Sequence, residues 1–375
     1  MSKSMQNSAL KTNKVTTFGL SSFFAIAFLG ISLIFNRTAC FAQSTPARTL
    51  LAISKSDHTL AIIDPATLKV IATLPVGSDP HEVIASADGK TAYVSIYGGG
   101  SLHEINVLDL WHKKVVSTIN TMPLKGIHGL DFVGNKLWFT AEGSKSIGRY
   151  DPETGLFDWT MGTGQDRTHM IYVTPDSKRI YTTNVASGTV SILVDTLMMP
   201  GGGGPKAGRP PGGGPQGGPP HPPHSDWEQT LIPVGKGSEG FDVSPDGKQL
   251  WTVGADEGII TVIDVHTKAV IASIDAKIIG ANRLKITPDG NRVLITSLRN
   301  GDLFVYDAAS RKEIKHLSTG HGAAGILIDD DGSRAFIGCT ADDYVAVVDL
   351  KTLKVTDHIG IRGADGLAWA VSAVK

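Results

Sequence analysis

Residues 241–264, FDVSPDGKQLWTVGADEGIITVID, contain the pattern that decides the fold. A short apolar run leads into the turn Pro245-Asp246-Gly247-Lys248, a second apolar run follows, and a third ends at Asp264. The Asp-Gly pair suits a tight reversal, because glycine readily takes the positive φ that such turns require. Runs of about five apolar and β-branched residues between turn signals predict short β-strands.

The same pattern recurs along the chain. An apolar run that ends in aspartate is found seven times, at Asp64, Asp109, Asp151, Asp195, Asp264, Asp307 and Asp349. The spacings are 45, 42, 44, 69, 43 and 42 residues, and turns related to Pro245-Asp246-Gly247 keep the same phase. Four short strands in a unit of about 43 residues are typical of a propeller blade. The sequence therefore predicts an all-β, seven-bladed β-propeller.

The two ends of the chain complete one unit between them. Residues 49–53 match the second strand of the unit, and the missing first strand is found near the other end, in residues 366–371. We therefore expect residues 367–371 to pair with residues 50–53. Sharing one blade between the N- and C-terminal strands would close the ring and remove a frayed sheet edge.

Composition sets the broad class of the protein. The chain has 375 residues, of which 41% are hydrophobic and 19% are charged, and its formal net charge is -1. This balance is that of a globular protein with a large core, and it excludes a disordered chain, a coiled coil and a polytopic membrane protein. A net charge near zero gives no reason to expect nucleic acid as a partner.

Residues 1–42 have the order of a secretory signal peptide. A basic stretch precedes a mostly apolar one, and small residues follow at Cys40 and Ala42. We predict cleavage after Ala42 and a periplasmic or secreted protein without a membrane partner. The alternative is an uncleaved anchor, because the apolar stretch is close to the length that spans a bilayer. The predicted mature chain, residues 43–375, keeps only Cys339, which we expect to be a buried, inert thiol.

A tract rich in glycine and proline accounts for the one long interval between repeats. Residues 200–224 contain 10 Gly and 9 Pro, a composition that can bury almost nothing. We predict a disordered insertion over residues 199–225, between the third and fourth strands of one blade. It is interpreted as a solvated loop, and the alternative is a flexible or adhesive arm.

Several of these residues resemble a known family. Tyr181-Thr182-Thr183-Asn184 nearly spells the YVTN motif, and Val243-Ser244-Pro245-Asp246-Gly247-Lys248 and Ile263-Asp264 stand where that repeat has its own signature. The chain thus resembles the YVTN (YncE-like) β-propeller repeat family over residues 48–375, apart from the insertion. The resemblance implies an exported bacterial or archaeal propeller. It implies no single activity, because this repeat occurs in binding, surface-layer and enzymatic proteins.

Seven positions are expected near the propeller axis, just before the first strand of each blade. Counting back from the repeated turns gives His81, His128, His169, Glu239, Asn282, Ala324 and Asp365. Three consecutive blades supply histidine, and imidazoles together with carboxylates suit a divalent metal. We predict His81, His128 and His169 as metal ligands. The other candidates are Glu142 and Glu239 for catalysis, and Arg167, Arg283, Arg299 and Asp365 for ligand binding. The alternative is a solvated polar funnel that binds nothing.

Three function classes remain open on the sequence. The first is a monomeric, non-enzymatic scaffold that binds a small ligand or a protein, with a metal or anion site in the axial funnel and no certain cofactor. The second, implied by related propellers, is a metal-assisted lyase or lactonase with Glu142 or Glu239 as general base. The third is a surface-layer or adhesive module that uses the insertion. The sequence contains no haem-attachment motif, no Walker glycine loop and no GxSxG motif.

Overall fold

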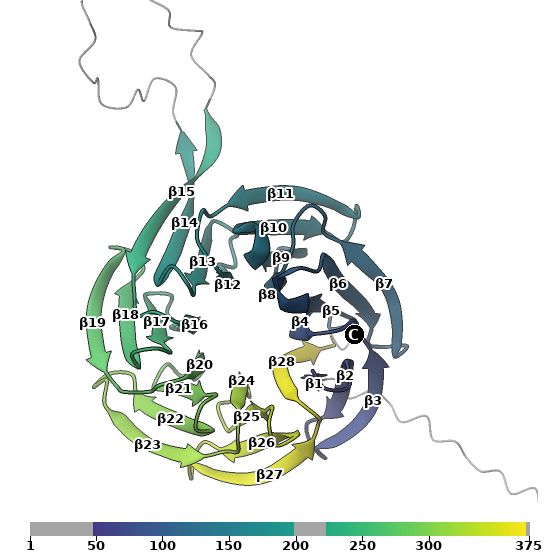
Figure 1. Ribbon diagram of the computed structural model, residues 1–375, viewed down its shortest axis with the longest axis vertical. Helices are drawn as coiled ribbons and strands as arrows, with labels where there is room; N and C mark the ends of the chain where they lie inside the picture. The colour runs from purple at the N-terminus through teal and green to yellow at the C-terminus, as the bar shows by residue number, and fades with distance from the viewer. Residues whose placement is uncertain (1–47, 199–222, 373–375) are drawn as a thin grey trace, which may run out of the picture. The chain divides into compact units, whose positions relative to one another are not determined.

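The computed structural model describes residues 48–198 and 223–372, which form seven four-stranded antiparallel sheets arranged as blades around an axis (Figure 1). The predicted seven-bladed β-propeller is therefore confirmed. The predicted signal peptide and nearly all of the predicted insertion lie outside the described residues, so both stay predictions. Within the described part of the chain, no helix has the length and apolar character needed to cross a membrane.

The blades are named A to G, and their strands are given from the axis outward. Blade A contains β28 (Ala364–Val371), β1 (Arg48–Ser54), β2 (Thr59–Asp64) and β3 (Lys69–Pro75). Blade B contains β4 (Pro80–Ala85), β5 (Thr91–Ile96), β6 (Glu104–Asp109) and β7 (Lys114–Asn120). Blade C contains β8 (Ile127–Val133), β9 (Lys136–Ala141), β10 (Ser146–Asp151) and β11 (Leu156–Gly162). Blade D contains β12 (Thr168–Val173), β13 (Arg179–Asn184), β14 (Thr189–Met198) and β15 (His224–Pro233).

The remaining blades continue around the ring in chain order. Blade E contains β16 (Ser238–Val243), β17 (Gln249–Gly254), β18 (Ile259–Asp264) and β19 (Ala269–Asp275). Blade F contains β20 (Ala281–Ile286), β21 (Arg292–Ser297), β22 (Asp302–Asp307) and β23 (Glu313–Ser318). Blade G contains β24 (Ala323–Ile328), β25 (Arg334–Cys339), β26 (Tyr344–Asp349) and β27 (Lys354–Gly360). Two short 3-10 helices, η1 (Gly98–Gly100) and η2 (Glu142–Ser144), follow β5 and β9.

The hydrophobic core lies between neighbouring blades. One cluster joins Leu51 and Ile62 of blade A to Val94 and Ile96 of blade B, and all four side chains are fully buried. Middle strands such as β2 are buried on both faces because each blade packs against two others, so their sequences are continuous apolar runs rather than alternating ones. Outer strands such as β3 are mostly exposed.

The C-terminal strand closes the ring as predicted. β28 pairs with β1 in the register Leu50↔Trp369, Leu51↔Ala368 and Ala52↔Leu367. Figure 1 shows yellow β28 beside purple β1. The closing strand begins at Ala364, which is earlier than the sequence suggested, and it ends at Val371.

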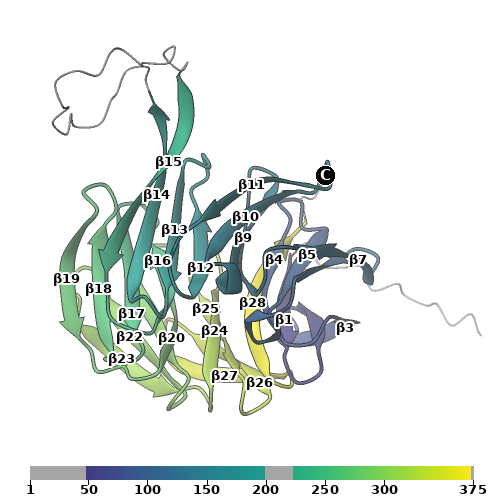
Figure 2. The same ribbon diagram turned by 45° about the horizontal axis from the view of Figure 1, so that its top comes forward.

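The hairpin that carries the insertion is longer than predicted. Its paired residues run from Thr189↔Pro233 to Met198↔His224, whereas the sequence suggested strands over residues 190–194 and 227–232. Figure 2 shows β14 and β15 projecting beyond the neighbouring strands. The insertion therefore joins the two ends of a hairpin whose last described pair is Met198↔His224.

Every innermost strand contains a register shift at its second and third residues. In β8 the shift lies between Ile127 and Leu130, and in β20 it lies between Ala281 and Leu284. Such bulges interrupt the ladder and redirect side chains. The second residues of these strands are His81, His128, His169, Glu239, Asn282, Ala324 and Asp365. These seven positions, called the axial ring below, were expected just before the strands; they lie inside them instead.

Glycine follows the axial-ring residue in four blades because the inner strands approach one another closely there. A Cβ atom on Gly325 would lie 2.2 Å from the backbone oxygen of Asp365, and one on Gly129 would lie 2.5 Å from that of His169. Blades B, D and F carry Glu82, Met170 and Arg283 at this third position instead.

Threonine hydroxyl groups connect the bulge of one blade to the axial ring of the next. Thr140 accepts the N–H of Gly129 at 2.8 Å and donates to the carbonyl oxygen of His169 at 2.6 Å. Thr183 of the YVTN-like stretch likewise donates to the carbonyl oxygen of Glu239 at 2.7 Å. These bonds fix the backbone of the axial ring, and they give the motif a structural role.

Asp131 makes a similar connection, and we expect it to make stability pH-dependent. It accepts the N–H of Val173 in the next blade at 2.7 Å, and burial raises its pKa from 3.8 to about 6. Because the folded-state pKa lies above the unfolded value, the stability contribution is complete below about pH 4 and is lost as pH rises through 6. We predict that urea denaturation of Asp131→Asn lacks this loss, which is about 3 kcal/mol in the native protein.

A matched control for this prediction is Asp242→Asn. Asp242 accepts the N–H of Ile286 at 2.9 Å and so links blades E and F in the same way, but Lys285 lies 3.6 Å from its carboxylate. Equal changes in the pH profile of both variants would contradict a specific role for Asp131.

Candidate functional site

A cavity of about 360 Å³ lies at the axial ring. All seven axial-ring residues line it, and Lys55, Tyr97, Arg167 and Arg283 contribute further polar walls. Because the ring residues sit on hydrogen-bonded inner strands rather than on loops alone, their positions are set by the fold. Equivalent positions of all seven blades therefore line one shared cavity.

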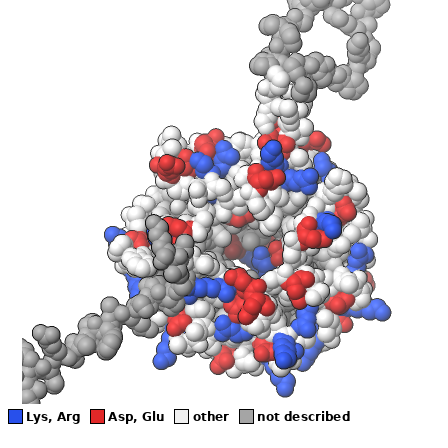
Figure 3. Space-filling view, turned by 180° about the vertical axis from the view of Figure 1, so that it is seen from behind, with Lys and Arg blue, Asp and Glu red and all other residues white. Residues whose placement is uncertain are grey.

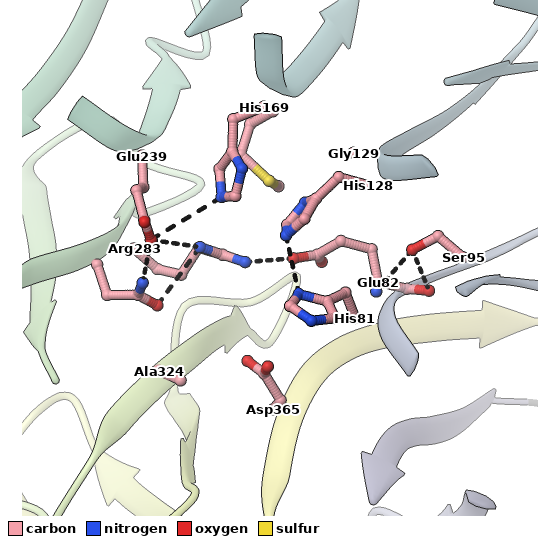
Figure 4. A network of polar contacts seen from close by, with 12 residues as sticks. His81, Glu82, Ser95, His128, Gly129, His169, Glu239, Arg283, Ala324 and Asp365 are labelled. Carbon is pink, nitrogen blue, oxygen red and sulfur yellow. Dashed lines mark hydrogen bonds and ion pairs between the residues drawn. The ribbon is translucent and has the colours of Figure 1, made fainter. Parts of the chain in front are cut away.

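The three predicted histidine ligands come together in this cavity (Figure 4). His81 Nδ1 lies 3.0 Å from His128 Nε2, and the rings of His128 and His169 have centroids 3.7 Å apart. Burial lowers the pKa of His81, and Lys55 lowers it further. Burial and the neighbouring imidazoles bring the pKa of His128 well below its usual value, so His128 is neutral at pH 7.

Two imidazole nitrogens in this wall have no hydrogen-bond partner among the described residues. They are His128 Nδ1 and His169 Nε2, and both atoms are buried. His169 Nε2 lies 3.9 Å from Glu239 Oε2, which is too far for a hydrogen bond. An unsatisfied buried polar group costs about 1–3 kcal/mol, so these nitrogens favour a partner supplied from outside the chain.

Glu142, at the start of η2, holds His169 in place. Its carboxylate accepts hydrogen bonds from His169 Nδ1 and from the Tyr97 hydroxyl, and Arg167 Nε lies 3.7 Å away. Burial alone would raise the pKa of Glu142, but the bonds from His169 and Tyr97 outweigh it and lower the pKa. Glu142 is therefore ionised, and it orients His169 so that Nε2 remains without a proton when the ring is neutral.

Arg283 forms an ion pair across the axial region. Its guanidinium donates to Glu82, and both side chains are about nine-tenths buried. Arg283 belongs to blade F and Glu82 to blade B, which do not pack against each other but are separated by blades A and G. Burial would lower the pKa of Arg283, but Glu82, Asp365 and Glu239 together raise it. Figure 3, seen from behind, shows acidic and basic side chains around the central opening.

Two of the arginines that were predicted to bind a ligand, Arg167 and Arg283, line the cavity. Both already form ion pairs with Glu239. Arg167 lies 3.4 Å from Glu239, and Arg283 Nη1 lies 3.8 Å from the same carboxylate. Glu239, a predicted catalytic residue, also accepts a hydrogen bond from Asn282. Arg299 is exposed and does not line the cavity.

Asp365 and Lys55 form the opposite wall. Lys55 Nζ lies 3.3 Å from Asp365 Oδ2 and 2.8 Å from His81 Nε2. His81 Nε2 is also 2.9 Å from Asp79 Oδ1. The predicted ligand-binding residue Asp365 is therefore part of the cavity, with Lys55 as its nearest cation.

Sequence reasoning missed Lys55, Glu82 and Tyr97. The repeat could have identified two of them by their position. Lys55 and Tyr97 each directly follow the second strand of a blade, as Glu142 does. The same position places Leu298 and Thr340 at the cavity. This second set of equivalent positions could have been counted from the repeat in the same way as the axial ring. Glu82 offers no such signal.

The described residues contain no group of three histidine, cysteine, aspartate or glutamate side chains arranged to hold a metal ion. His81 and His128 face each other as hydrogen-bond partners, and both nitrogens of His81 are engaged, so His81 would have to give up a bond to ligate a metal. Metal binding by His81, His128 and His169 stays a prediction.

Comparison with known proteins adds information about the fold. No family model and no curated protein matches the sequence. A solved protein of unknown function from Desulfotomaculum acetoxidans is similar, with a TM-score of 0.67 and 12% identity over 87% of this chain and 99% of that chain. A putative 6-phosphogluconolactonase from Bacteroides fragilis has a TM-score of 0.63 and 14% identity, again over 87% and 99%.

A third similar structure is a dihydro-heme d1 dehydrogenase, with a TM-score of 0.56 and 14% identity over 85% of this chain and 74% of that chain. The two of these structures that have a described role differ in it, and all three share one architecture with this chain. Identities this low establish the propeller fold alone, since one fold supports many activities. The function must therefore be argued from the cavity itself.

Proposed function

We propose that this propeller is a binding scaffold that holds one small polar ligand in the axial cavity. The observation that carries the proposal is the pair of buried imidazole nitrogens, His128 Nδ1 and His169 Nε2, that lack a partner. A ligand that forms hydrogen bonds with both atoms would remove their desolvation cost. The cavity volume of about 360 Å³ falls within the usual range for small-molecule sites, about 300–1,000 Å³.

The rigidity of the surroundings supports binding. The axial ring is carried by bulges whose backbone groups are bonded to threonine hydroxyls of the second strands, as at Thr140 and Thr183. Arg283 is held by Glu82, and His169 by Glu142. Side chains that are already held in place lose little entropy when a ligand binds, which favours affinity.

A divalent metal is one form that the ligand could take. His128 and His169 would supply the nitrogen ligands, and the lowered pKa of His128 keeps that ring in the neutral form that metals require. The contact between His169 and Glu142 resembles the carboxylate that often orients a metal-binding histidine. A bound ion would supply Lewis-acid chemistry in the cavity.

A second candidate is an enzyme, and one observation favours it. His169 donates Nδ1–H to Glu142 and keeps Nε2 without a partner, which is the arrangement of an oriented general base. If the protein is an enzyme, His169 takes the role of general base that the sequence suggested for Glu142 or Glu239, and Glu142 positions His169.

We also propose that the protein is exported to the periplasm or outside the cell. The signal-like pattern of residues 1–42 supports this.

The test is to look for a ligand that co-purifies with the protein. Native mass spectrometry should find one small molecule per chain, and elemental analysis of the same sample should show whether it is a metal. We predict that His169→Ala lowers occupancy at least about tenfold, because His169 supplies an unpaired nitrogen to the cavity.

The matched control is His321→Ala, since His321 is exposed and bonded to Asp342 outside the cavity. Its occupancy should equal that of the native protein. Absence of any co-purifying molecule, together with no thermal stabilisation by sugars, hydroxy acids, amines or metal ions, would contradict the binding proposal.

A further inference from the structure

The cavity walls and the residues directly behind them contain more carboxylates than cations. The carboxylates are Asp79, Glu82, Glu142, Glu239 and Asp365, and the cations are Lys55, Arg167 and Arg283. The side chains of Glu82, Glu142 and Asp365 are largely buried, so solvent screens their charges weakly, and an uncompensated carboxylate there strongly favours a nearby positive charge.

Each of the three cations already contacts two carboxylates. Lys55 lies 3.8 Å from Asp79 and 3.3 Å from Asp365. Arg167 lies 3.7 Å from Glu142 and 3.4 Å from Glu239.

Arg283 completes the set, because it contacts Glu82 and lies 3.8 Å from Glu239. No cation of the cavity is therefore left over to bind an anionic ligand. A ligand carboxylate or phosphate would have to displace an existing ion pair, which would leave a protein carboxylate without compensation.

Asp365 and Glu239 keep acceptor capacity that faces the cavity. Asp365 makes its one ion pair among the described residues with Lys55, and its side chain is only 10% exposed. Figure 4 shows its carboxylate directed toward the space between Arg283 and His81. Glu239 Oε1 contacts Arg167 alone at 3.4 Å. A carboxylate accepts about four hydrogen bonds, so both groups can take further donors.

The histidine wall adds acceptors of its own. His169 Nδ1 donates to Glu142, so its buried Nε2 atom presents a lone pair whenever the ring carries a single proton. The bond between His81 Nδ1 and His128 Nε2 requires one of these nitrogens to be unprotonated, so the two rings cannot both carry a full positive charge. These two histidines therefore compensate at most one of the carboxylates around them.

We infer that the ligand of the axial cavity carries a positive charge, as an ammonium group or a metal cation, that is attracted by the carboxylates of Asp365 and Glu239 in the cavity wall. The inference rests on the proposed function and narrows its ligand class. An ammonium group brings several N–H donors, which would satisfy both carboxylates and His169 Nε2. A metal cation would need these side chains to move together, because in their present positions they form no metal-binding group.

Three four-carbon probes of different charge test the inference: 1,4-diaminobutane, 1,4-butanediol and succinate. Isothermal titration calorimetry of the purified, chelator-treated protein with each probe separates charge from size and shape. Zinc chloride is titrated separately to distinguish a metal from an amine. We expect the diamine or zinc to bind with a stoichiometry of one, and the affinity for the diamine to fall as salt is raised.

Two conservative variants test whether Asp365 and Glu239 bind the positive charge of the ligand. Asp365→Asn and Glu239→Gln keep the shape of each side chain but remove its charge, and each should weaken binding of the cation at least about tenfold. Asp342→Asn is the control, because Asp342 contacts the exposed His321 and lies outside the cavity lining. Circular dichroism and melting of all three variants confirm that binding is compared between folded proteins.

The outcomes separate this inference from the proposed function. Tighter binding of succinate or of the diol than of both cations would overturn the inference while leaving a ligand-binding cavity in place. Unchanged cation affinity in Asp365→Asn and Glu239→Gln would likewise overturn it. If neither cation binds, the inference is wrong, and the co-purification measurement alone then decides whether the cavity is a binding site.

Discussion

Replacing Arg283 with methionine lowers the free energy of unfolding by about 3–5 kcal/mol, as measured by urea denaturation at pH 7. The reason is that Glu82 stays behind as a buried charge that has lost its partner. Removing one member of a buried pair costs more than the pair itself contributes, because the remaining ion has been taken out of water without compensation.

Two further variants make this result interpretable. The double variant Arg283→Met with Glu82→Leu removes both charges, and it should recover most of the lost stability. Arg149→Met is the control, since Arg149 pairs with Asp158 near the surface, where loss of an ion pair costs about 1 kcal/mol or less. A small loss in Arg283→Met, or a double variant no more stable than the single one, would contradict a buried cross-axis pair.

A chain that stops at Gly363 should lose cooperative folding altogether. It lacks β28, so the inner edge of β1 has no partner, and the buried residues Ala368 and Ala370 are missing from the core between blades A and B. The truncation also removes Asp365 from the axial ring. We expect the truncated protein to show no cooperative thermal transition by circular dichroism and to elute as aggregates in size-exclusion chromatography.

A larger deletion elsewhere serves as the control. Replacing residues 199–223 with Asn-Gly joins Met198 to His224 through a two-residue turn of the type that suits hairpins, and every described strand pairing is kept. This variant should melt within a few degrees of the native protein, because shortening a connection changes loop-closure entropy only slightly. Cooperative melting of the truncated chain at the native temperature would show that β28 is dispensable.

Much of the fold was predictable because each blade repeats the same landmarks. The aspartates at the ends of the third strands, from Asp64 to Asp349, gave the number of blades, and the incomplete units at the two ends gave the closure. The position of a residue within its repeat unit also predicted which residues lie at the axis, including His81, His128 and His169. It misplaced them by a residue or two because bulges, which leave no mark in an apolar pattern, lie at this point of every inner strand.

The contacts within the cavity could not be predicted in this way. The position of a residue within the repeat predicts its blade and its height along the axis. It does not predict which side chain of another blade that residue contacts. Arg283 and Glu82 lie one position after the axial ring, where four blades have glycine, and their pairing joins blades that are not neighbours. Likewise, the sequence presented Glu142 as a free base, whereas its oxygens are occupied by His169 and Tyr97.

The pairing of β28 with β1 also determines when the molecule can be completed during its synthesis. β1 is made before, and β28 after, all the other described strands, and the two pair through Leu50 and Trp369. Until β28 has been made, a nascent chain carries an open strand edge that can pair with other nascent chains. Blades B to G each consist of four consecutive strands, but blade A stays incomplete until β28 has been made. Productive folding of this protein is therefore a late event, and its yield should depend on keeping that edge covered while elongation continues.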